Sequence, residues 1–597
     1  MVGRFVVGIF LVIGIFNFTF SQEGVEGSSY DVIVVGSEPE GIMTAVAAAE
    51  SGAKTLLITE DAVLGGLFVL GEMNSLDLRT SPTSYQQGLF ERWWQAVGRG
   101  HSFDVGRAEQ TFVAMLREAG VTVRTAAPKL LPVVQDGRVV GVRVADGTNT
   151  AGGVVQASQV VDATADMTFG ALAGVGYHVG FGSLGYPERM ADTLVFRIDG
   201  IDWDALQAGV QARGRGYATA DDWVAWGHFG GYPAAYRSVE EGLRLRGLNL
   251  GRQEDGSVLV NALLIYGIDP FDPESVAEGK ARAEREAPRV IAYLAEELPG
   301  FENAYLGGVA QRLYIRETRH LDALCSLSVD DVLNNRVTPE DVAAGGYPLD
   351  VQTLTPFDSG YVLGTPDIYG VRLCSTVPRE LDGLWVVGKA AGYDPLAASS
   401  ARVVPFGMAL GEAVGVAAAL AAERNLTPAQ LALAPEQVRE VRQTLEARGA
   451  YLPPLEPRDP VGPHTHPSYA DYRLMLSRGL AVGGYDNAPG LDAPMSSLSY
   501  VYLLSNVGER FLDTPELGKT LLTRYPQNGE PLSQQQALEI TQDAACELGV
   551  CVEATWDALT AAGLAPTSFM PEEVLTRGEM YTLAAGIARL QPVAESP

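Results

Sequence analysis

The hydrophobic and polar positions after residue 29 fall in blocks that predict a strand, a helix and a second strand. An apolar run at 31–35 ends in a short turn, an alanine-rich helix covers 41–51, and a second apolar run covers 54–59. This order is typical of a parallel βαβ unit, because two parallel strands need a crossover connection. Further apolar runs predict strands at 121–124, 139–144 and 154–161.

Beyond residue 190 the pattern changes, and segments rich in Trp, Tyr and Gly replace the regular blocks. Spaced charges on an apolar background predict a long helix over 273–298. An alanine- and glycine-rich run predicts another helix over 406–423. Residues 452–467 contain repeated prolines and indicate a linker by composition.

Two segments beyond this linker, 469–507 and 537–590, resemble one another weakly. Each has a helix, a Gly-Leu stop, a short loop, a Ser or Thr that suits an N-cap, and a second amphipathic helix. The pair resembles degenerate S-layer-homology repeats, which implies a cell-wall polymer as partner. A generic small helical domain is the alternative interpretation.

The first 21 residues have the three parts of a secretory signal peptide. Arg4 precedes an apolar run, and small residues at Thr19 and Ser21 suit cleavage after Ser21. An uncleaved N-terminal anchor is the alternative, because the weakly polar stretch through Phe20 nearly spans a thin bilayer. Either way, we expect the protein to be exported to the periplasm, the cell envelope or the medium.

The composition limits the classes of partner that the protein is expected to bind. The 597 residues carry a formal net charge of −30, without any block of five like charges. This acidity disfavours nucleic acid and anionic membrane surfaces, since phosphates attract basic patches. The four cysteines show no zinc-ligand spacing, so no metal site is expected.

The most specific local motif is Gly36-Ser37-Glu38-Pro39-Glu40-Gly41, which follows the first strand and opens the helix. In a dinucleotide-binding fold the first Gly makes the tight turn and the last lets helix and strand pack closely. The helix N-terminus faces the pyrophosphate. Glu60, at the end of the next strand, is the expected ribose ligand.

Glu38 departs from this pattern, because a glycine normally stands in the middle of the loop. An acid beside a pyrophosphate is repulsive unless its charge is screened. Two interpretations follow: the Glu38 side chain turns away from the anion, or the loop no longer binds a dinucleotide. The rest of the chain favours binding.

Later segments carry a family resemblance. They are Leu64-Gly65-Gly66, Val160–Asp166 with Ala163 and Thr164, Ile315–Arg319, Gly345–Asp350, Gly383–Asp394 with Gly388, and Ser399–Pro405. Together they resemble the exported FAD-dependent oxidoreductase family over about residues 30–450. The resemblance implies FAD as cofactor, and no His, Cys or Tyr stands in a flavin-attachment pattern, so non-covalent binding is expected.

The implied fold is α/β and glutathione-reductase-like, with an FAD-binding Rossmann domain assembled from both ends of the sequence. An α+β substrate domain is inserted, and a small helical domain follows. Asp394 is expected near the ribityl chain, and the helix after Pro405 beneath the isoalloxazine. The expected segments are 1–21 signal peptide, 30–195 and 376–451 FAD-binding domain, 196–375 substrate domain, 452–467 linker and 468–597 helical domain. The expected FAD contacts are Gly36, Ser37, Glu38, Pro39, Gly41, Glu60, Gly65, Gly66, Ala163, Thr164, Gly388, Asp394 and Pro405.

Four residues are candidates for chemistry. Arg316, Arg319 and His320 lie in a run that the resemblance places near the flavin, and Arg402 precedes the flavin-facing helix. A guanidinium there suits a substrate carboxylate or reduced flavin. Buried ion pairs for the first three, and helix-start packing for Arg402, are the structural alternatives.

The four cysteines could be free thiols or form disulfides. Cys325 and Cys374 are spaced unlike a redox-active pair, so inert thiols are the favoured interpretation. Cys546 and Cys551 lie five apart, and an intact helix would hold their side chains on different faces, although export would permit a disulfide.

The sequence therefore predicts an exported FAD-dependent oxidoreductase that transfers electrons or hydride between a small molecule and flavin. The alternative is a carbohydrate-related envelope protein that keeps the flavoprotein fold without redox activity. A nicotinamide-dependent dehydrogenase is disfavoured, because only one strand–turn–helix fingerprint is present.

Overall fold

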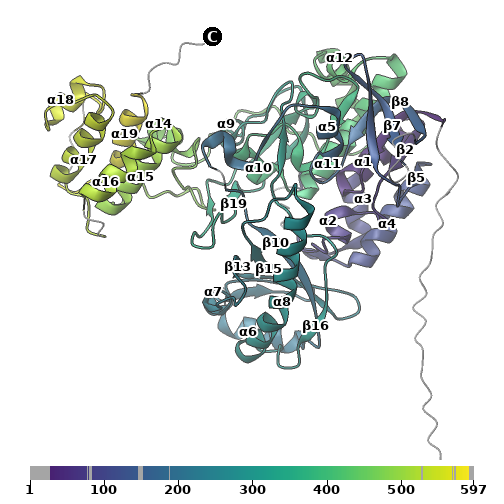
Figure 1. The fold of residues 1–597 in the computed structure, drawn as a ribbon, viewed down its shortest axis with the longest axis horizontal. Helices are drawn as coiled ribbons and strands as arrows, with labels where there is room; N and C mark the ends of the chain where they lie inside the picture. Colours follow the sequence, from purple (N-terminus) through teal and green to yellow (C-terminus); the bar gives the residue numbers. More distant parts are fainter. Residues whose placement is uncertain are drawn as a thin grey trace, which may run out of the picture.

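The computed structural model describes residues 27–76, 78, 84–145, 152–186, 188–214, 216–525, 529–567, 569 and 573–590. The expected signal peptide, residues 1–21, lies outside the described residues. Figure 1 shows three groups of elements: a mixed sheet with its helices, a second sheet below it, and a set of helices at one end.

The first sheet is assembled from distant parts of the chain. Its order is β5-β2-β1-β8-β7-β6, and β22 pairs with β8. The neighbours β5, β2, β1, β8 and β22 run parallel, whereas β7 and β6 return antiparallel. The strands are β1 Ser29–Val35, β2 Thr55–Ile58, β5 Thr122–Arg124, β6 Leu130–Gln135, β7 Arg138–Val144, β8 Val154–Asp162 and β22 Leu384–Val386.

Two helices, α1 (Pro39–Glu50) and α11 (Val404–Arg424), pack tightly together beside this sheet. A Cβ at Gly411 would lie 2.3 Å from the Glu40 carbonyl oxygen, and one at Gly415 would lie 2.3 Å from that of Thr44. The glycines of α11 therefore allow the close contact. The other helices here are α2 Gly66–Val69, α3 Leu89–Val97, α4 Val105–Glu118, α5 Thr168–Ala173, α10 Pro395–Ala401, α12 Pro428–Ala432 and α13 Pro435–Ala447.

The second sheet is antiparallel, with order β11-β12-β14-β15-β10-β16, and β13 pairs with β15. It spans residues 192–309, and the helix expected over 273–298 is α8 (Pro273–Glu297). The remaining elements are β10 Asp192–Asp199, α6 Trp203–Arg213, β11 Ala218–Ala220, β12 Val224–Gly227, α7 Tyr232–Ala235, β13 Leu243–Leu245, β14 Leu248–Arg252, β15 Val258–Ile265 and β16 Tyr305–Val309.

Within the described ranges, four small two-stranded sheets and short 3-10 turns lie between these parts. The sheets pair β3 Gly98–Arg99 with β4 Ser102–Phe103, β9 Tyr177–Val179 with β17 Arg319–Leu321, β18 Asp341–Gly345 with β21 Tyr369–Arg372, and β19 Asp350–Val351 with β20 Tyr361–Val362. The short helix α9 (Val329–Leu333) lies between β17 and β18.

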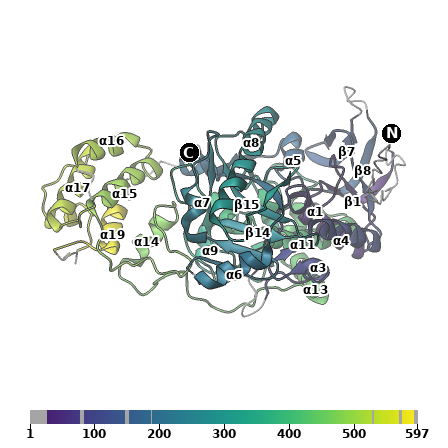
Figure 2. The same ribbon diagram turned by 90° about the horizontal axis from the view of Figure 1, so that it is seen from below.

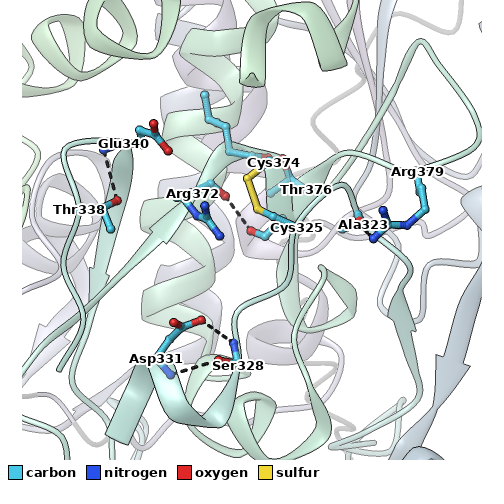
Figure 3. Close-up of a disulfide and its surroundings, with 12 residues drawn as sticks. Ala323, Cys325, Ser328, Asp331, Thr338, Glu340, Arg372, Cys374, Thr376 and Arg379 are labelled. Carbon is cyan, nitrogen blue, oxygen red and sulfur yellow. Dashed lines mark hydrogen bonds between the residues drawn. A yellow bond between two sulfur atoms is a disulfide. The ribbon is translucent and has the colours of Figure 1, made fainter. Parts of the chain in front are cut away.

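A disulfide joins Cys325 to Cys374, so the interpretation of these residues as inert thiols is wrong (Figure 3). The backbone N–H of Cys325 donates to the carbonyl of Cys374, and the two Cα atoms are 5.3 Å apart. Folding thus brings together residues 49 positions apart, which no local spacing reveals.

A second disulfide joins Cys546 to Cys551. Helix α17 (Gln534–Glu547) ends before Cys551, and Gly549 turns the chain with φ +86°. The objection that an intact helix separates these side chains therefore does not apply.

The proline-rich segment 452–467 contains no helix or strand, but it is held against the preceding domain. Val461 is buried and its N–H donates to Leu333, while Asn335 donates to the carbonyl of Asp459. The segment is therefore a packed connection, more ordered than its composition indicates.

The last described helices lie together at one end of the molecule in both views (Figures 1 and 2). They are α14 Tyr469–Leu476, α15 Ser497–Arg510, α16 Pro515–Arg524, α17, α18 Trp556–Ala561 and α19 Arg577–Ala588. Arg473 of α14 ion-pairs with Asp330 of α9 at 2.9 Å, and thus ties this group to the rest.

Three starts in this group are equivalent, where the sequence suggested two repeats. Ser496, Ser533 and Thr576 cap α15, α17 and α19 through their side chains. The residues just before these caps form a closed ring of hydrogen bonds: Met495 donates to Leu575, Leu575 to Leu532, and Leu532 to Met495. The three helix starts therefore meet in a three-fold arrangement.

One described helix, α11, is long and apolar enough to span a membrane. Nearly all of it is buried inside the molecule, so we interpret it as a core helix of the fold.

Candidate functional site

The loop between β1 and α1 turns tightly and packs against Ala163 at the end of β8. Gly36 has φ +123°, and a Cβ there would lie 2.2 Å from the Ala163 carbonyl oxygen. A Cβ at Gly41 would lie 2.4 Å from that of Ala163. These two glycines therefore have the roles predicted for them. Pro39 starts α1, and no side chain caps its first N–H groups, which leaves this end suited to an anion.

Glu38 turns across the cleft towards α2. Its carboxylate accepts from the Leu67 N–H at 2.8 Å and pairs with Arg312 at 2.8 Å. Burial raises the pKa of Glu38, and the charge of Arg312 opposes this. Of the two interpretations of Glu38, the structure therefore favours a side chain that turns away from α1 and is neutralised.

Glu40 is the second acid of this loop and is buried beside Gly388 and Gly407. Burial, followed by the charge of Glu38, raises its pKa to about 8, and its Oε2 has no hydrogen-bond partner. At neutral pH this carboxyl, which lines the cleft, is therefore mainly protonated.

The structure places Glu60 away from this loop. Its carboxylate accepts from the Leu130 N–H at 2.7 Å, and the side chain is exposed. The next residue, Asp61, is the acid that faces the loop, where it accepts from Ser37 at 2.5 Å and pairs with Arg312 at 2.5 Å. The ribose contact at Glu60 therefore stays a prediction, and Asp61 is the neighbouring acid that contacts the loop.

The segment after β22 closes the cleft from the other side. Gly388 has φ +83° and lines it together with Ala163 and Thr164, while Lys389 pairs with Asp166 at 2.9 Å. Asp394 lies elsewhere, and its side chain caps α10 by accepting from Ala397. The acid expected near a ribityl chain is therefore a helix cap.

Gly65 and Gly66 complete this side of the loop. They have φ +105° and +40°, and a Cβ at Gly66 would lie within 2.4 Å of both Glu38 carboxylate oxygens. As the side chains stand, Arg312 spans the cleft and the free volume is only about 50 Å³. A dinucleotide needs more room than this, so Arg312 must turn aside to admit one.

A larger cavity of about 670 Å³, the chamber, lies between the second sheet and the start of α11. Pro405 and Phe406 of α11 line one wall, and Trp226, Asn249 and Asn261 line another. The chamber and the cofactor cleft share four lining residues: Tyr314, Arg316, Arg402 and Val404.

Tyr314, which the sequence did not single out, lies at the centre of this shared wall. Arg402 donates to its hydroxyl at 2.8 Å, and the guanidinium of Arg316 lies 4.3 Å from the centre of its ring. Burial alone would raise the pKa of Tyr314, but Arg402, Arg316, Lys389 and Arg246 lower it below its ordinary value. The only sequence signal was its position two residues before Arg316.

The four chemical candidates separate into two pairs. Arg316 and Arg402 are buried and line the chamber. Arg319 instead lies against Phe271 at 4.0 Å and donates to the Asp166 carbonyl. His320 is buried in β17, 3.4 Å from Glu317, and does not line either cavity. His320 thus contacts an acid, Glu317, as in the structural alternative, and lies away from both cavities.

Fold and site together define a dinucleotide-binding α/β protein with an antiparallel sheet inserted beside its cofactor cleft. The chain belongs to the FAD-dependent oxidoreductase family, whose model matches residues 31–445. FAD is the cofactor of this family, and the expectations of an oxidoreductase and of FAD are confirmed at this level. Comparison with curated proteins gives no match.

Solved structures of flavoenzymes show only distant likeness. A geranylgeranyl bacteriochlorophyll reductase-like protein from Thermoplasma acidophilum is 15% identical, with 83% of this chain and 100% of that chain covered and a TM-score of 0.37. The p-nitrophenol 4-monooxygenase of Pseudomonas putida is 12% identical, covering 77% and 94%, with a TM-score of 0.35. A myxobacterial chondrochloren halogenase is 15% identical, covering 76% and 90%, with a TM-score of 0.33. At these scores we draw no conclusion from them.

The backbone of the cleft fits FAD. Gly36 and Gly41 let the loop pack closely on Ala163, no side chain caps the start of α1, which suits a diphosphate once Arg312 has moved, and Asp61 bonds to Ser37 of the loop. Bound there, FAD would supply the electron-accepting group of the reaction. Among the described residues, no group of three His, Cys, Asp or Glu side chains is placed to hold a metal.

Proposed function

We propose that this protein is an exported FAD-dependent oxidoreductase that exchanges electrons or hydride with a small molecule held in the chamber. The observation that carries the proposal is the wall shared by the two cavities. Because Tyr314, Arg316 and Arg402 border both, a substrate in the chamber lies next to the cofactor cleft. Such adjacency is what hydride transfer requires.

Tyr314 is the residue suited to accept a proton from the substrate. Its lowered pKa raises the share of phenolate near neutral pH, and Arg402 and Arg316 hold that negative charge. Arg316 is itself fixed by donating to the Ala191 carbonyl and the Thr193 hydroxyl. The expected kinetic signature is activity that rises with pH through the lowered Tyr314 pKa.

The finer fold assignment belongs to the same proposal. The pairing of β22 with β8, next to β1, supports a glutathione-reductase-like FAD domain built from both ends of the sequence. Pro405, in the first turn of α11, supports the expectation that this helix begins beneath the isoalloxazine.

The test uses the flavin as its own reporter. In an anaerobic titration with dithionite, the bound flavin is expected to be reduced reversibly, and Arg402→Met is expected to make its midpoint potential more negative. The reason is that a nearby positive charge stabilises the negative charge of reduced flavin. Arg439→Met, an exposed arginine on α13, is the matched control. Unchanged potentials in both variants would contradict the placement of the flavin beside Arg402.

A location at the cell envelope is part of the proposal. Two disulfides support export, because disulfides persist mainly in oxidising compartments. The ring of helix starts at Met495, Leu532 and Leu575 supports S-layer-homology-like repeats that bind a cell-wall polymer. Sedimentation of the intact protein with purified cell-wall fragments tests this, with the chain shortened after Pro467 as control. Equal sedimentation of both would contradict it.

The alternative function, an envelope protein without redox activity, is favoured by one observation. Arg312, Glu38 and Asp61 close the cleft as the side chains stand. A protein that remains colourless after incubation with excess FAD would establish this alternative.

A further inference from the structure

The charges lining the chamber are unusual for so acidic a protein. Of the charged side chains that the structure describes along the chamber, three are guanidinium groups, from Arg246, Arg316 and Arg402, and one is a carboxylate, from Asp350. The chain as a whole carries a net charge of −30. Burying like charges together is unfavourable unless an anion compensates them. The chamber therefore has the charge of a site for an anionic ligand.

Two of these arginines have hydrogen-bond donors without a partner. The Nε of Arg246 and the Nε of Arg402 are buried and have no hydrogen-bond partner. Asp350 lies 3.7 Å from Arg402, too far for a good hydrogen bond. Nearby Asp192 cancels this charge only in part at neutral pH, since burial raises its pKa to about 7. A carboxylate, which takes two parallel N–H bonds from a guanidinium, satisfies such donors.

The opposite wall has a different chemistry. Trp226 pairs with Asn249 across β12 and β14, and the register Leu250–Val260 places Asn249 beside Asn261 of β15. All three line the chamber as one row across three strands. Asn261 is buried, and its Oδ1 has no hydrogen-bond partner. Side-chain amides, which both donate and accept, suit hydroxyl groups, and an aromatic ring suits the C–H face of a sugar.

From these two walls we infer that the chamber binds a hydroxylated carboxylic acid of the size of a sugar acid. The arginines hold the carboxylate, and the Trp226–Asn249–Asn261 row holds the hydroxyl-bearing end. The volume of about 670 Å³ accommodates a six-carbon acid. This inference rests on the proposed function in one respect: it names the substrate of the same site. The binding itself does not require electron transfer, so the two claims can be tested separately.

The test is isothermal titration calorimetry of the full-length protein with three probes of similar size. D-glucuronate has both groups, hexanoate has only the carboxylate, and D-glucose has only hydroxyls. We expect glucuronate to bind at least about tenfold more tightly than hexanoate and about a hundredfold more tightly than glucose. Equal binding of the three, or no binding of glucuronate, overturns the inference.

Two variants test which wall of the chamber binds which group of the ligand. Arg246→Met, at a half-buried position, should weaken glucuronate binding by about tenfold or more and leave glucose unchanged, while Arg439→Met on exposed α13 changes neither. Asn261→Ala should remove the preference for glucuronate over hexanoate. Thermal melting of each variant shows that it is folded. If Arg246→Met and Arg439→Met have equal effects, the arginines are not the carboxylate site.

Flavin content measured on the same samples separates this inference from the proposed function. If the protein is yellow but does not bind glucuronate, the inferred substrate class is wrong and the proposed redox function still stands. A protein that binds glucuronate but takes up no FAD overturns the redox function and leaves the sugar-acid site standing.

Discussion

At the residue scale, the acids around the first loop decide how the cofactor binds. The sequence showed that Glu38 replaces a glycine, but not that it would bond to Leu67 and Arg312. Glu60 illustrates the limit of a spacing rule: the expected acid and the acid that faces the loop, Asp61, differ by one position in a turn. Tyr314 could not be predicted, because its environment comes from residues distant in sequence.

Glu38→Gly should tighten FAD binding. The Glu38 carboxylate occupies the start of α2 and engages Arg312, and both would otherwise be available to a diphosphate. We expect the dissociation constant for FAD to fall by about tenfold, as measured by flavin fluorescence quenching, since one charged hydrogen bond is worth about 1.5–3 kcal/mol. Glu38→Gln removes the charge but keeps the size of the side chain, so its dissociation constant for FAD should lie between those of the wild type and Glu38→Gly. Weaker FAD binding in both variants would show that Glu38 supports the cofactor.

Glu40→Gln should stabilise the protein at alkaline pH. The folded state raises the pKa of Glu40 from 4.5 to about 8, so it favours the protonated form. The advantage of keeping that proton is fully present below pH 4.5 and is lost as the pH rises to about 8. The melting temperature of the variant should therefore exceed that of the wild type increasingly from pH 5 to 8. A difference independent of pH would mean that Glu40 does not titrate there.

At the scale of single elements, the pattern of apolar residues predicted those strands and helices whose residues are adjacent in sequence. The strands at β1, β2, β5, β7 and β8 and the helices α1, α8 and α11 correspond to apolar periodicity, and they place the glycine loop. The two-residue strands of the small sheets carry no such period. Their pairing, like the Cys325–Cys374 bond, depends on segments far apart in the chain.

Removing the Cys325–Cys374 disulfide should cost more stability than removing Cys546–Cys551. The bridged residues are 49 and 5 positions apart, and a longer closed loop restricts the unfolded chain more. Chain entropy gives about 4 kcal/mol for the first and about 2 kcal/mol for the second. Denaturant unfolding of Cys325→Ala/Cys374→Ala and of Cys546→Ala/Cys551→Ala measures both, and the reverse order would contradict the entropic account.

At the scale of the whole molecule, the sequence predicted a helical region after a proline-rich segment, and the described helices α14 to α19 lie there (Figure 1). It did not predict how firmly segment 452–467 packs, because Val461 and Asp459 bond to α9 and its neighbours, far earlier in the chain. Composition describes how stiff a free chain is and contains no information about such partners.

A chain ending at Pro467 should stay soluble and keep its FAD. It retains the bonds of Val461 and Asp459 to the preceding domain and all described residues that line the cofactor cleft. It loses the Arg473–Asp330 ion pair and the hydrogen bonds of Gly483, Gly484 and Asn487 to Leu363, Val362 and Thr365, none of which lines that cleft. Size-exclusion chromatography with absorbance near 450 nm, a usual flavin band, measures both properties. Aggregation, or loss of flavin on shortening, would show that the last helices are part of the oxidoreductase core.

The central claim is that the cleft beside the chamber holds FAD, and the most direct measurement is the identity and amount of flavin in the purified full-length protein. After incubation with FAD and removal of the excess, acid precipitation should release FAD, rather than FMN, at about one per chain into a yellow supernatant above a colourless pellet. A protein that takes up no flavin, with Glu38 still paired to Arg312, would contradict the account.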